Sequence, residues 1–331
     1  MSELVTLSEQ LTDEEWLAEL AAIGADRGYF EQIGNTHTAL FLDETLDTLM
    51  VSFDTVTSAR TGSASGISHG MLQAEIFGWS HLSLIAKTPT WFRDDEVVDY
   101  FDRLVDEAFF EDFDRVIFYG AGMCAYAAAA FSVAAPGATV VLAAPQATLD
   151  PAIAPWDDRF LSQRRRDFTS RYGYAPDMVG GAEAVYIFYD PMEELDAMHA
   201  ALFRGPQVHH LRMRHFGARI GDELQAMNVL GRVFKAASES NLTAAFCQRL
   251  LRRRRRHLPY LKNLLSRLHV EERHYLTILL CRSVLQVKDV QRFRHHLRLA
   301  EGHLEKAGRP LPVSHRRKRG AESLPRLSEA E

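Results

Sequence analysis

The sequence predicts an α/β fold, in which a doubly wound and mostly parallel sheet is followed by an all-helical module. Three observations carry this prediction. Short apolar runs alternate with helical patterns between residues 38 and 234, which is typical of a parallel sheet covered by helices. At residues 114–145 a glycine-rich turn joins an apolar run to an alanine-rich run, as in a βαβ unit. After residue 238 the strand pattern stops and only helical spacing of Leu, Phe and Tyr continues.

The composition is that of an ordinary globular protein, with 331 residues of which 47% are hydrophobic and 25% charged. The N-terminal stretch lacks the basic and apolar regions of a signal peptide, and no apolar run is long enough to span a membrane. We therefore expect a protein of the bacterial cytoplasm. Cys124, Cys247 and Cys281 form no C-x-x-C pair, so we expect no disulfide framework and no metal site, and no cofactor is implied.

Charge is distributed unevenly along the chain. Residues 1–234 hold 16 Lys and Arg against 35 Asp and Glu, a net charge of −19, whereas residues 235–331 carry +13. We take this change as a domain boundary. It predicts an α/β domain over 1–234, a helical module over 238–305 and a disordered basic tail over 306–331, where prolines and charges replace large apolar residues.

The elements of the first half follow from apolar spacing and capping residues. Thr12 precedes three acids, as at the start of a helix that runs to about Ile23. The further elements expected before the βαβ unit are strands at 38–42, 47–53 and 80–86 and helices at 71–77 and from Asp94 onward.

The second half continues the alternation after one interruption. Residues 147–176 mix Trp, Arg and Tyr without a regular pattern, as a cap over a site would. The remaining expected strands are 116–119, 139–144, 185–189 and 208–213, and the expected helices are 123–135, 193–203, 224–234, 242–251, 259–268, 272–285 and 290–304.

Two known patterns fit the glycine-rich turn. Gly120, Gly122 and Ala125 satisfy G-x-G-x-x-A, the dinucleotide fingerprint. That fingerprint also needs an acidic residue about 20 positions later, at the end of the next strand. The strand at 139–144 is followed by no carboxylate before Asp150, and strands precede the unit that should open the domain. Dinucleotide binding is therefore the weaker interpretation.

The other pattern is the nucleophile elbow, a strand-to-helix turn written G-x-S-x-G. Residues 119–128, YGAGMCAYAA, resemble the YGxSMGGYAA elbow of a subset of bacterial α/β-hydrolase-like proteins. The resemblance implies a sheet of α/β-hydrolase type. In this register Gly122 occupies the nucleophile position, where it has no side chain with which to attack. Cys124 stands where the family normally has glycine.

The same resemblance implies where the other site residues lie. In this family an acid and then a histidine follow later strands. Asp190 ends the run VYIFYD and His215 ends HHLRMRH, so these two are the expected acid and base. Without a nucleophile both would be vestigial. Asp196 is an alternative acid. The expected oxyanion or ligand-binding donors are the amide of Met123 and one from the loop at Asp54 and Thr55.

These residues leave three functions open. The first is an α/β-hydrolase-fold protein that binds or scaffolds, with a small anionic or carbonyl ligand held by the surviving amides. The second is an ester or acyl hydrolase using Cys124 or another nucleophile, although Tyr126 would then crowd the elbow. The third is a nucleotide-dependent oxidoreductase.

A label of phosphoadenosine phosphosulfate reductase belongs to that third function. It is sometimes attached to proteins that resemble this chain in RYGYAPDM at 171–178 and DAMHAALF at 196–203. The SGG phosphate loop and the E-C-G-L-H motif of that reductase family are absent from the sequence. The residues therefore give this activity no support.

The sequence contains two arginine clusters. Arg252 to Arg256 would spread around a helix, which favours docking onto the acidic domain or onto a protein partner through the C-terminal helices. No aromatic platform accompanies them, so we do not expect a nucleic-acid partner. Arg164 to Arg166, in the cap-like segment, are better placed to meet an anionic ligand.

Overall fold

The structure is a computed structural model, and it describes residues 4–312. The chain divides into two compact units, Met1–His257 and Leu258–Glu331. The division thus lies after His257 and not between residues 234 and 238 as the charge change predicted. The reason is that helix α10 (Ala244–Leu251) packs against strand β8 (Val208–Arg212) and so belongs to the first unit. From residue 313 onward the expected tail lies outside the described residues.

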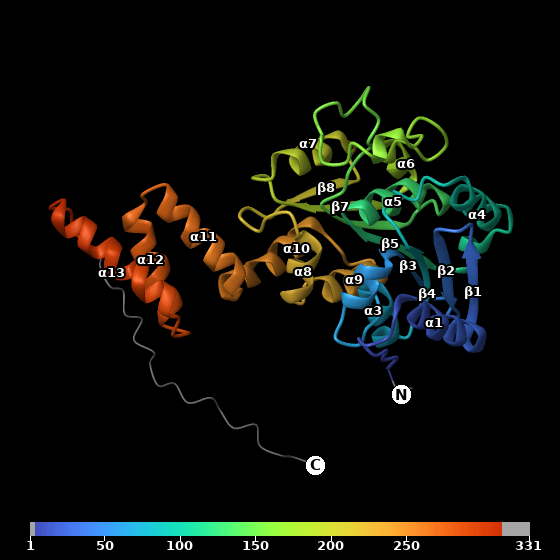
Figure 1. Ribbon diagram of the computed structural model, residues 1–331, viewed down its shortest axis with the longest axis horizontal. Coiled ribbons are helices and arrows are strands. Elements are labelled where there is room, and N and C mark those ends of the chain that lie inside the picture. The colour runs from blue at the N-terminus through green and yellow to red at the C-terminus, as the bar shows by residue number, and fades with distance from the viewer. Residues whose placement is uncertain (1–3, 313–331) are drawn as a thin grey trace, which may run out of the picture. The chain divides into compact units, whose positions relative to one another are not determined.

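The first unit is built on an eight-stranded sheet with the order β1-β2-β4-β3-β5-β6-β7-β8 (Figure 1). Its strands are β1 (Gly28–Ile33), β2 (His37–Leu42), β3 (Thr48–Thr55), β4 (Ser80–Ala86), β5 (Arg115–Ala121), β6 (Thr139–Ala143), β7 (Ala184–Tyr189) and β8 (Val208–Arg212). Strand β2 is antiparallel to β1 and β4, and all other neighbours are parallel. This mostly parallel, doubly wound sheet of α/β-hydrolase type confirms the predicted fold class.

Helices cover both faces of the sheet (Figure 1). Those of the first unit are α1 (Asp13–Arg27), α2 (Val56–Thr61), α3 (His69–Phe77), α4 (Asp95–Asp106), α5 (Met123–Phe131), α6 (Ala175–Met178), α7 (Glu194–Leu202), α8 (Ile220–Ala226), α9 (Leu230–Ser238) and α10 (Ala244–Leu251). Alternate residues of a strand point to opposite faces. Phe41 of β2 accordingly joins the core that includes α4 and α5, whereas Leu40 joins the core that includes α1, α2 and α3.

Helix α5 lies closest to the centre of the sheet. Residues 124–131 are all buried, and five of them are alanines. Such small side chains let the helix approach β3, β5 and β6 closely. The Tyr126 hydroxyl donates to the carbonyl of Gly173 at 2.9 Å, which ties the helix to the segment predicted as a cap.

Two predicted elements differ in detail. The helix expected at 224–234 is divided into α8 and α9, because Asn228 has φ = 51°, a left-handed conformation that ends a helix. Strand β1 was not predicted. Its side chains are mostly exposed or half-buried, so Glu31 and Gln32 conceal the apolar alternation that marks a strand.

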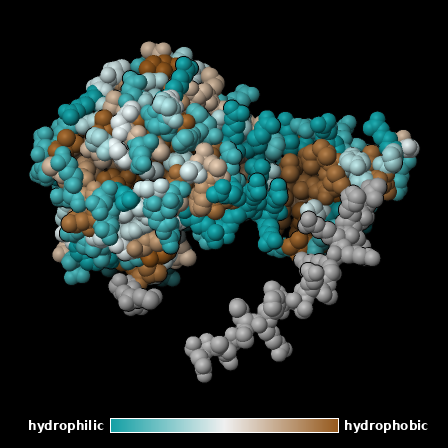
Figure 2. Space-filling view, turned by 180° about the vertical axis from the view of Figure 1, so that it is seen from behind, coloured by the Kyte–Doolittle hydropathy of each residue, from teal (hydrophilic) through white to brown (hydrophobic). Residues whose placement is uncertain are grey.

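The second unit is all-helical, as predicted, with α11 (Leu258–Val270), α12 (His274–Leu285) and α13 (Gln291–Lys306). Leu265, Cys281 and Phe293 are completely buried among these helices. Several apolar side chains stay exposed, and Figure 2 shows apolar surface on this unit. They are Val270, Tyr275, Leu276, Leu279, Val287 and Leu299. No helix within residues 4–312 combines the length and the apolar character that crossing a membrane requires.

Candidate functional site

The predicted elbow lies in a sharp turn between β5 and α5. Strand β5 ends at Ala121, Gly122 follows with φ = 58° and ψ = −123°, and α5 begins at Met123. The Gly122 amide donates to the Ala143 carbonyl at 2.8 Å, and its own carbonyl accepts from Ala125 at 3.0 Å. The backbone therefore reverses between strand and helix at Gly122, in a conformation that residues with side chains rarely adopt.

The glycines of this turn differ in how much space surrounds them. A Cβ atom at Gly120 would lie 2.1 Å from the carbonyl oxygen of Cys124, so no larger residue fits there without moving the helix. A Cβ atom on Gly221 of α8 would lie 2.9 Å from that of Ala121. At Gly122, in contrast, a Cβ atom would meet nothing within 4 Å. A side chain at position 122 would therefore have open space around its Cβ atom.

The expected backbone donors have different surroundings. Met123 occupies the first position of α5, where the helix offers its amide no carbonyl partner. Its sulfur accepts a hydrogen bond from the Trp91 amide at 3.3 Å. The Thr55 amide, however, donates to the Ser58 hydroxyl at 2.8 Å in the capping box of α2. Met123 therefore retains a donor, whereas the Thr55 amide already has an acceptor.

Trp91 adds a donor that the sequence analysis did not consider. Its side chain is 3% exposed, and its indole nitrogen is buried without a hydrogen-bond partner among the described residues. The ring packs edge-on against Phe160, with the two ring centroids 4.7 Å apart. Trp91 and Phe92 both have positive φ angles, 51° and 54°. A buried donor without an acceptor calls for a ligand or water.

The thiol of Cys124 faces conditions that oppose nucleophilic attack. The residue is buried in the first turn of α5, with 5% of its surface exposed. Burial raises the pKa of Cys124 well above its ordinary value, and the nearby Asp54 carboxyl adds to the effect. Because the thiolate is the reactive form, this environment keeps the sulfur inert.

Asp54, at the end of β3, lies in a buried polar chain. The Ser52 hydroxyl donates to the Asp54 carboxyl at 3.1 Å and lies 2.9 Å from Nε2 of His81. Burial raises the pKa of Asp54 to about 7, although hydrogen bonds from nearby serine hydroxyls oppose the shift. The group therefore exchanges its proton near neutral pH, which makes it a proton donor or acceptor beside the elbow.

This environment predicts an effect of Asp54→Asn on stability. Since the pKa of Asp54 is about 7 in the folded chain and 3.8 ordinarily, the wild type loses stability as the pH rises from about 4 to 7. Asparagine does not ionise and can still accept from Ser52. We expect the variant to be more stable than the wild type at pH 8 by about 2–4 kcal/mol, and this advantage to vanish near pH 4.

Urea unfolding of both proteins at several pH values measures this difference. Subtracting the two curves cancels the buried histidines, among them His69 and His81, whose pKa values burial lowers to about 4 and about 3. A constant difference between the proteins from pH 4 to pH 8 would show that Asp54 does not titrate in this way.

Asp190 contacts the loop that carries His215. Asp190 directly follows β7, is 1% exposed and accepts from the Met192 amide at 2.9 Å. Its other oxygen accepts from the Gly217 amide at 2.8 Å, so it fixes the loop that carries His215. His215 itself is half-buried with φ = 69°, and it follows the end of β8 instead of ending that strand. The pairing of these two residues as acid and base stays a prediction.

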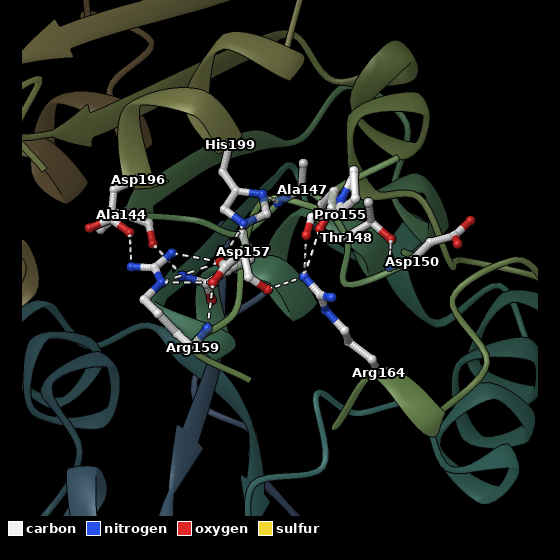
Figure 3. A network of polar contacts seen from close by, with 12 residues as sticks. Ala144, Ala147, Thr148, Asp150, Pro155, Asp157, Arg159, Arg164, Asp196 and His199 are labelled. Atoms are coloured by element: carbon white, nitrogen blue, oxygen red, sulfur yellow. Dashed lines mark hydrogen bonds and ion pairs between the residues drawn. The ribbon is translucent and has the colours of Figure 1, made fainter. Parts of the chain in front are cut away.

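A second histidine–aspartate pair, which was not predicted from the sequence, joins the segment predicted as a cap to α7 (Figure 3). Asp157 and His199 are both fully buried, with His199 Nε2 2.8 Å from the Asp157 carboxyl. The Ala147 amide donates to Nδ1 of His199 at 3.2 Å, so Nε2 carries the proton and the ring is neutral. Burial alone would raise the pKa of Asp157, but hydrogen bonds from Arg159 and His199 outweigh it and lower the pKa to about 2.

Arg159 and Arg164 extend this network, as Figure 3 shows. Arg159 bonds to both Asp157 and Asp196, at 2.8 and 2.7 Å. Asp196, the alternative catalytic acid, is therefore engaged in an ion pair. Arg164 donates to the carbonyls of Ala154 and Pro155 at 3.0 and 3.1 Å. Its guanidinium group is therefore bound to the loop backbone, although an anionic ligand was expected there. The contacts of His199 and Asp196 with this segment fasten residues 147–164 to α7.

A cavity of about 660 Å³ lies at the amino ends of β5, β6 and β7. Arg115, Thr139 and Glu183 are among its lining residues, and none of the predicted site residues is. Ligands of open α/β sheets bind outside the carboxyl ends of the strands. The cavity is at the opposite end, so it is separate from the elbow.

Cofactor and metal ligation find little support in the described part of the chain. Within residues 4–312 no group of three or more His, Cys, Asp or Glu is placed to hold a metal ion. The dinucleotide interpretation also lacks its acid, because β6 ends at Ala143 and is followed by Ala144 in a left-handed conformation.

Comparison with known proteins gives structural likenesses only. No protein-family model matches the sequence, and no curated protein matches it. Brefeldin A esterase, a bacterial homologue of human hormone-sensitive lipase, is 13% identical, with 76% of this chain and 90% of that chain covered and a TM-score of 0.39. A hyperthermophilic esterase from the archaeon Pyrobaculum calidifontis is 14% identical, with 74% and 94% covered and a TM-score of 0.37.

An acetyltransferase is among the similar structures as well. The capsule O-acetyltransferase of Neisseria meningitidis serogroup A is 14% identical, with 61% of this chain and 93% of that chain covered and a TM-score of 0.37. At such identities these likenesses concern the arrangement of the chain and not its chemistry.

Proposed function

We propose that this chain binds a small ligand carrying a carboxylate or carbonyl group at the elbow and does not hydrolyse it efficiently. The observation that carries the proposal is Gly122, which keeps the strained elbow conformation and an open site without supplying a nucleophile. An elbow without a hydroxyl cannot form an acyl intermediate, but it still presents the amino end of α5 to a ligand.

Two donors support an anionic or carbonyl ligand. The Met123 amide begins α5, where the helix dipole favours negative charge. The Trp91 indole N–H is buried without an acceptor among the described residues, and its backbone contacts the Met123 side chain. Asp54, with its pKa raised to about 7 by burial, would add a neutral carboxyl near the same turn.

The proposal is preferred over hydrolysis by Cys124 because that thiol is buried and its pKa is raised well above the ordinary value. The same reasoning opposes a thiol-based reductase. Burial raises the pKa of Cys247 and of Cys281 to about 12 each, so neither offers a reactive thiolate. We retain the cytoplasm as the proposed location.

Alkylation tests the chemistry of the thiols directly. We expect iodoacetamide at pH 7.5 to modify the three cysteines slowly in the native protein and fast in urea, because all three are buried. For Cys247 and Cys281 a pKa near 12 instead of 9 reduces the thiolate population by about a thousandfold. Intact mass against time measures both rates, and rapid native labelling of Cys124 would contradict the prediction.

The experiment that tests the proposed function treats the wild type with a fluorophosphonate probe beside a screen of short-chain esters. Thermal unfolding with acetate, butyrate, phenylacetate and inorganic phosphate then tests for binding. We expect no stoichiometric adduct, no turnover and a concentration-dependent stabilisation by one of these anions. One selectively labelled residue with matching turnover would make the chain a hydrolase and end the proposal.

A further inference from the structure

The strongest positive feature of the first unit is a pair of grooves on either side of a short 3₁₀ helix, Arg252–Arg256. One groove, of about 770 Å³, is lined by β8, α10 and this helix. The other, of about 530 Å³, lies between this helix and the end of α8. Arg249, Arg252 and Arg255 line both, and we call the two together the arginine grooves.

The 3₁₀ geometry determines which arginines line which groove. With three residues per turn, residues three apart lie on the same face. Arg252 and Arg255 therefore share the face that borders both grooves, while Arg254 lines only the larger groove and Arg256 only the smaller. Five arginines spread around an α-helix were expected, and the tighter 3₁₀ helix instead concentrates them along two adjoining grooves.

The cluster is held in place by the surrounding fold. Leu250 and Leu251 are buried where α10 packs on β8. The Tyr186 hydroxyl donates to the Leu242 carbonyl at 2.7 Å just before α10. At the other end of the 3₁₀ helix, His257 pairs with Glu223 of α8. Anchors on both sides fix the backbone that carries the guanidinium groups.

This positive charge has little compensation within the described chain. Residues 242–257 contain six arginines and no acid. Within residues 4–312 no carboxylate forms an ion pair with Arg249, Arg252 or Arg255, and Arg212 of β8 adds another such arginine to the larger groove. Like charges held this close repel one another unless an anion enters.

We propose that the arginine grooves bind a chain of linked phosphate groups. The guanidinium fork matches two phosphate oxygens, and a row of such forks matches successive phosphates better than a single small anion. Neither groove is lined by Phe, Tyr or Trp, so the surface offers bases no stacking platform. Recognition is therefore of the phosphate chain and not of the base sequence. This chemistry fits inorganic polyphosphate and, contrary to the expectation from the sequence, also a nucleic-acid backbone.

The test uses the full-length protein and a fluorescein-labelled oligothymidylate, with fluorescence anisotropy at 50 to 200 mM salt. The variant replaces Arg249, Arg252 and Arg255 with alanine, all three of which are exposed. The charge-matched control replaces Arg232, Lys262 and Arg298, which are exposed and lie outside both grooves. Inorganic polyphosphate and polyglutamate serve as competitors.

We expect the groove variant to bind at least about tenfold more weakly and its salt slope to fall by about 2, while the control stays within about twofold of the wild type. Thermal stabilisation by polyphosphate that is lost in the groove variant, with no binding of oligothymidylate, would assign the inorganic chain, and binding of both would assign any linked phosphates. An equal loss in the control variant, equal competition by polyglutamate, or no binding to either phosphate chain would overturn the proposal.

Discussion

Gly122→Ser is expected to convert the unreactive elbow into one that a fluorophosphonate labels stoichiometrically. A Cβ atom at this position meets nothing within 4 Å, so the hydroxyl has room at the end of α5. The positive φ of 58° strains any side chain and costs about 1–3 kcal/mol, which a folded domain of this size tolerates. His215 lies in the loop that Asp190 fixes. If these two residues are a vestigial acid and base, His215 can activate the new hydroxyl.

The measurement is intact mass after exposure to the probe, together with hydrolysis of a short-chain nitrophenyl ester. Gly122→Ala is the matched control, because it introduces the same backbone strain without a hydroxyl. Adding His215→Ala to the serine variant is expected to lower the labelling rate by about 10²–10⁴. A folded serine variant that neither reacts with the probe nor hydrolyses the ester would show that His215 is not placed as a base. That result would leave the proposal of ligand binding by the wild type untouched.

Gly120→Ala is expected to have the largest effect on stability. Its Cβ atom would lie 2.1 Å from the Cys124 carbonyl oxygen and 2.6 Å from the Ala125 amide nitrogen. Both are backbone atoms of the first turn of α5, and that turn is buried on the sheet. Relief requires moving the helix, so we expect a loss of about 3–5 kcal/mol in the free energy of unfolding.

Urea denaturation followed by far-UV circular dichroism measures this loss. Gly180→Ala is the control, because a Cβ atom there meets nothing within 4 Å and its backbone is not left-handed. We expect it to change stability by less than about 1 kcal/mol. Equal stability of the two variants would mean that α5 is not seated against the elbow as described.

The sequence predicted seven of the eight strands, because most of them are buried on both faces and read as continuous apolar runs. Strand β1 was not predicted, because it lies at the edge of the sheet and exposes polar residues. The unit boundary was wrong because charge marks the surface of a segment and not its packing. Helix α10 lies within the basic part of the chain, yet it packs on β8 of the first unit.

The candidate site could be predicted only where chain order determines it. The turn after β5, Asp190 after β7 and His215 after β8 follow from strand positions. Properties that depend on three-dimensional surroundings could not be predicted. Asp157 and His199 are 42 positions apart, and only the structure brings them together. The raised pKa of Asp54 similarly comes from burial, which no local pattern encodes.

The conformation of Gly122 also bears on how this elbow could change over generations. The glycine codons GGT and GGC become the serine codons AGT and AGC by one base substitution. Since the turn, the helix behind it and the space before it are already present, the backbone needs no rearrangement to receive the new residue. With GGT or GGC as the Gly122 codon, a library made by error-prone amplification and screened for ester cleavage would sample this change among its single mutants.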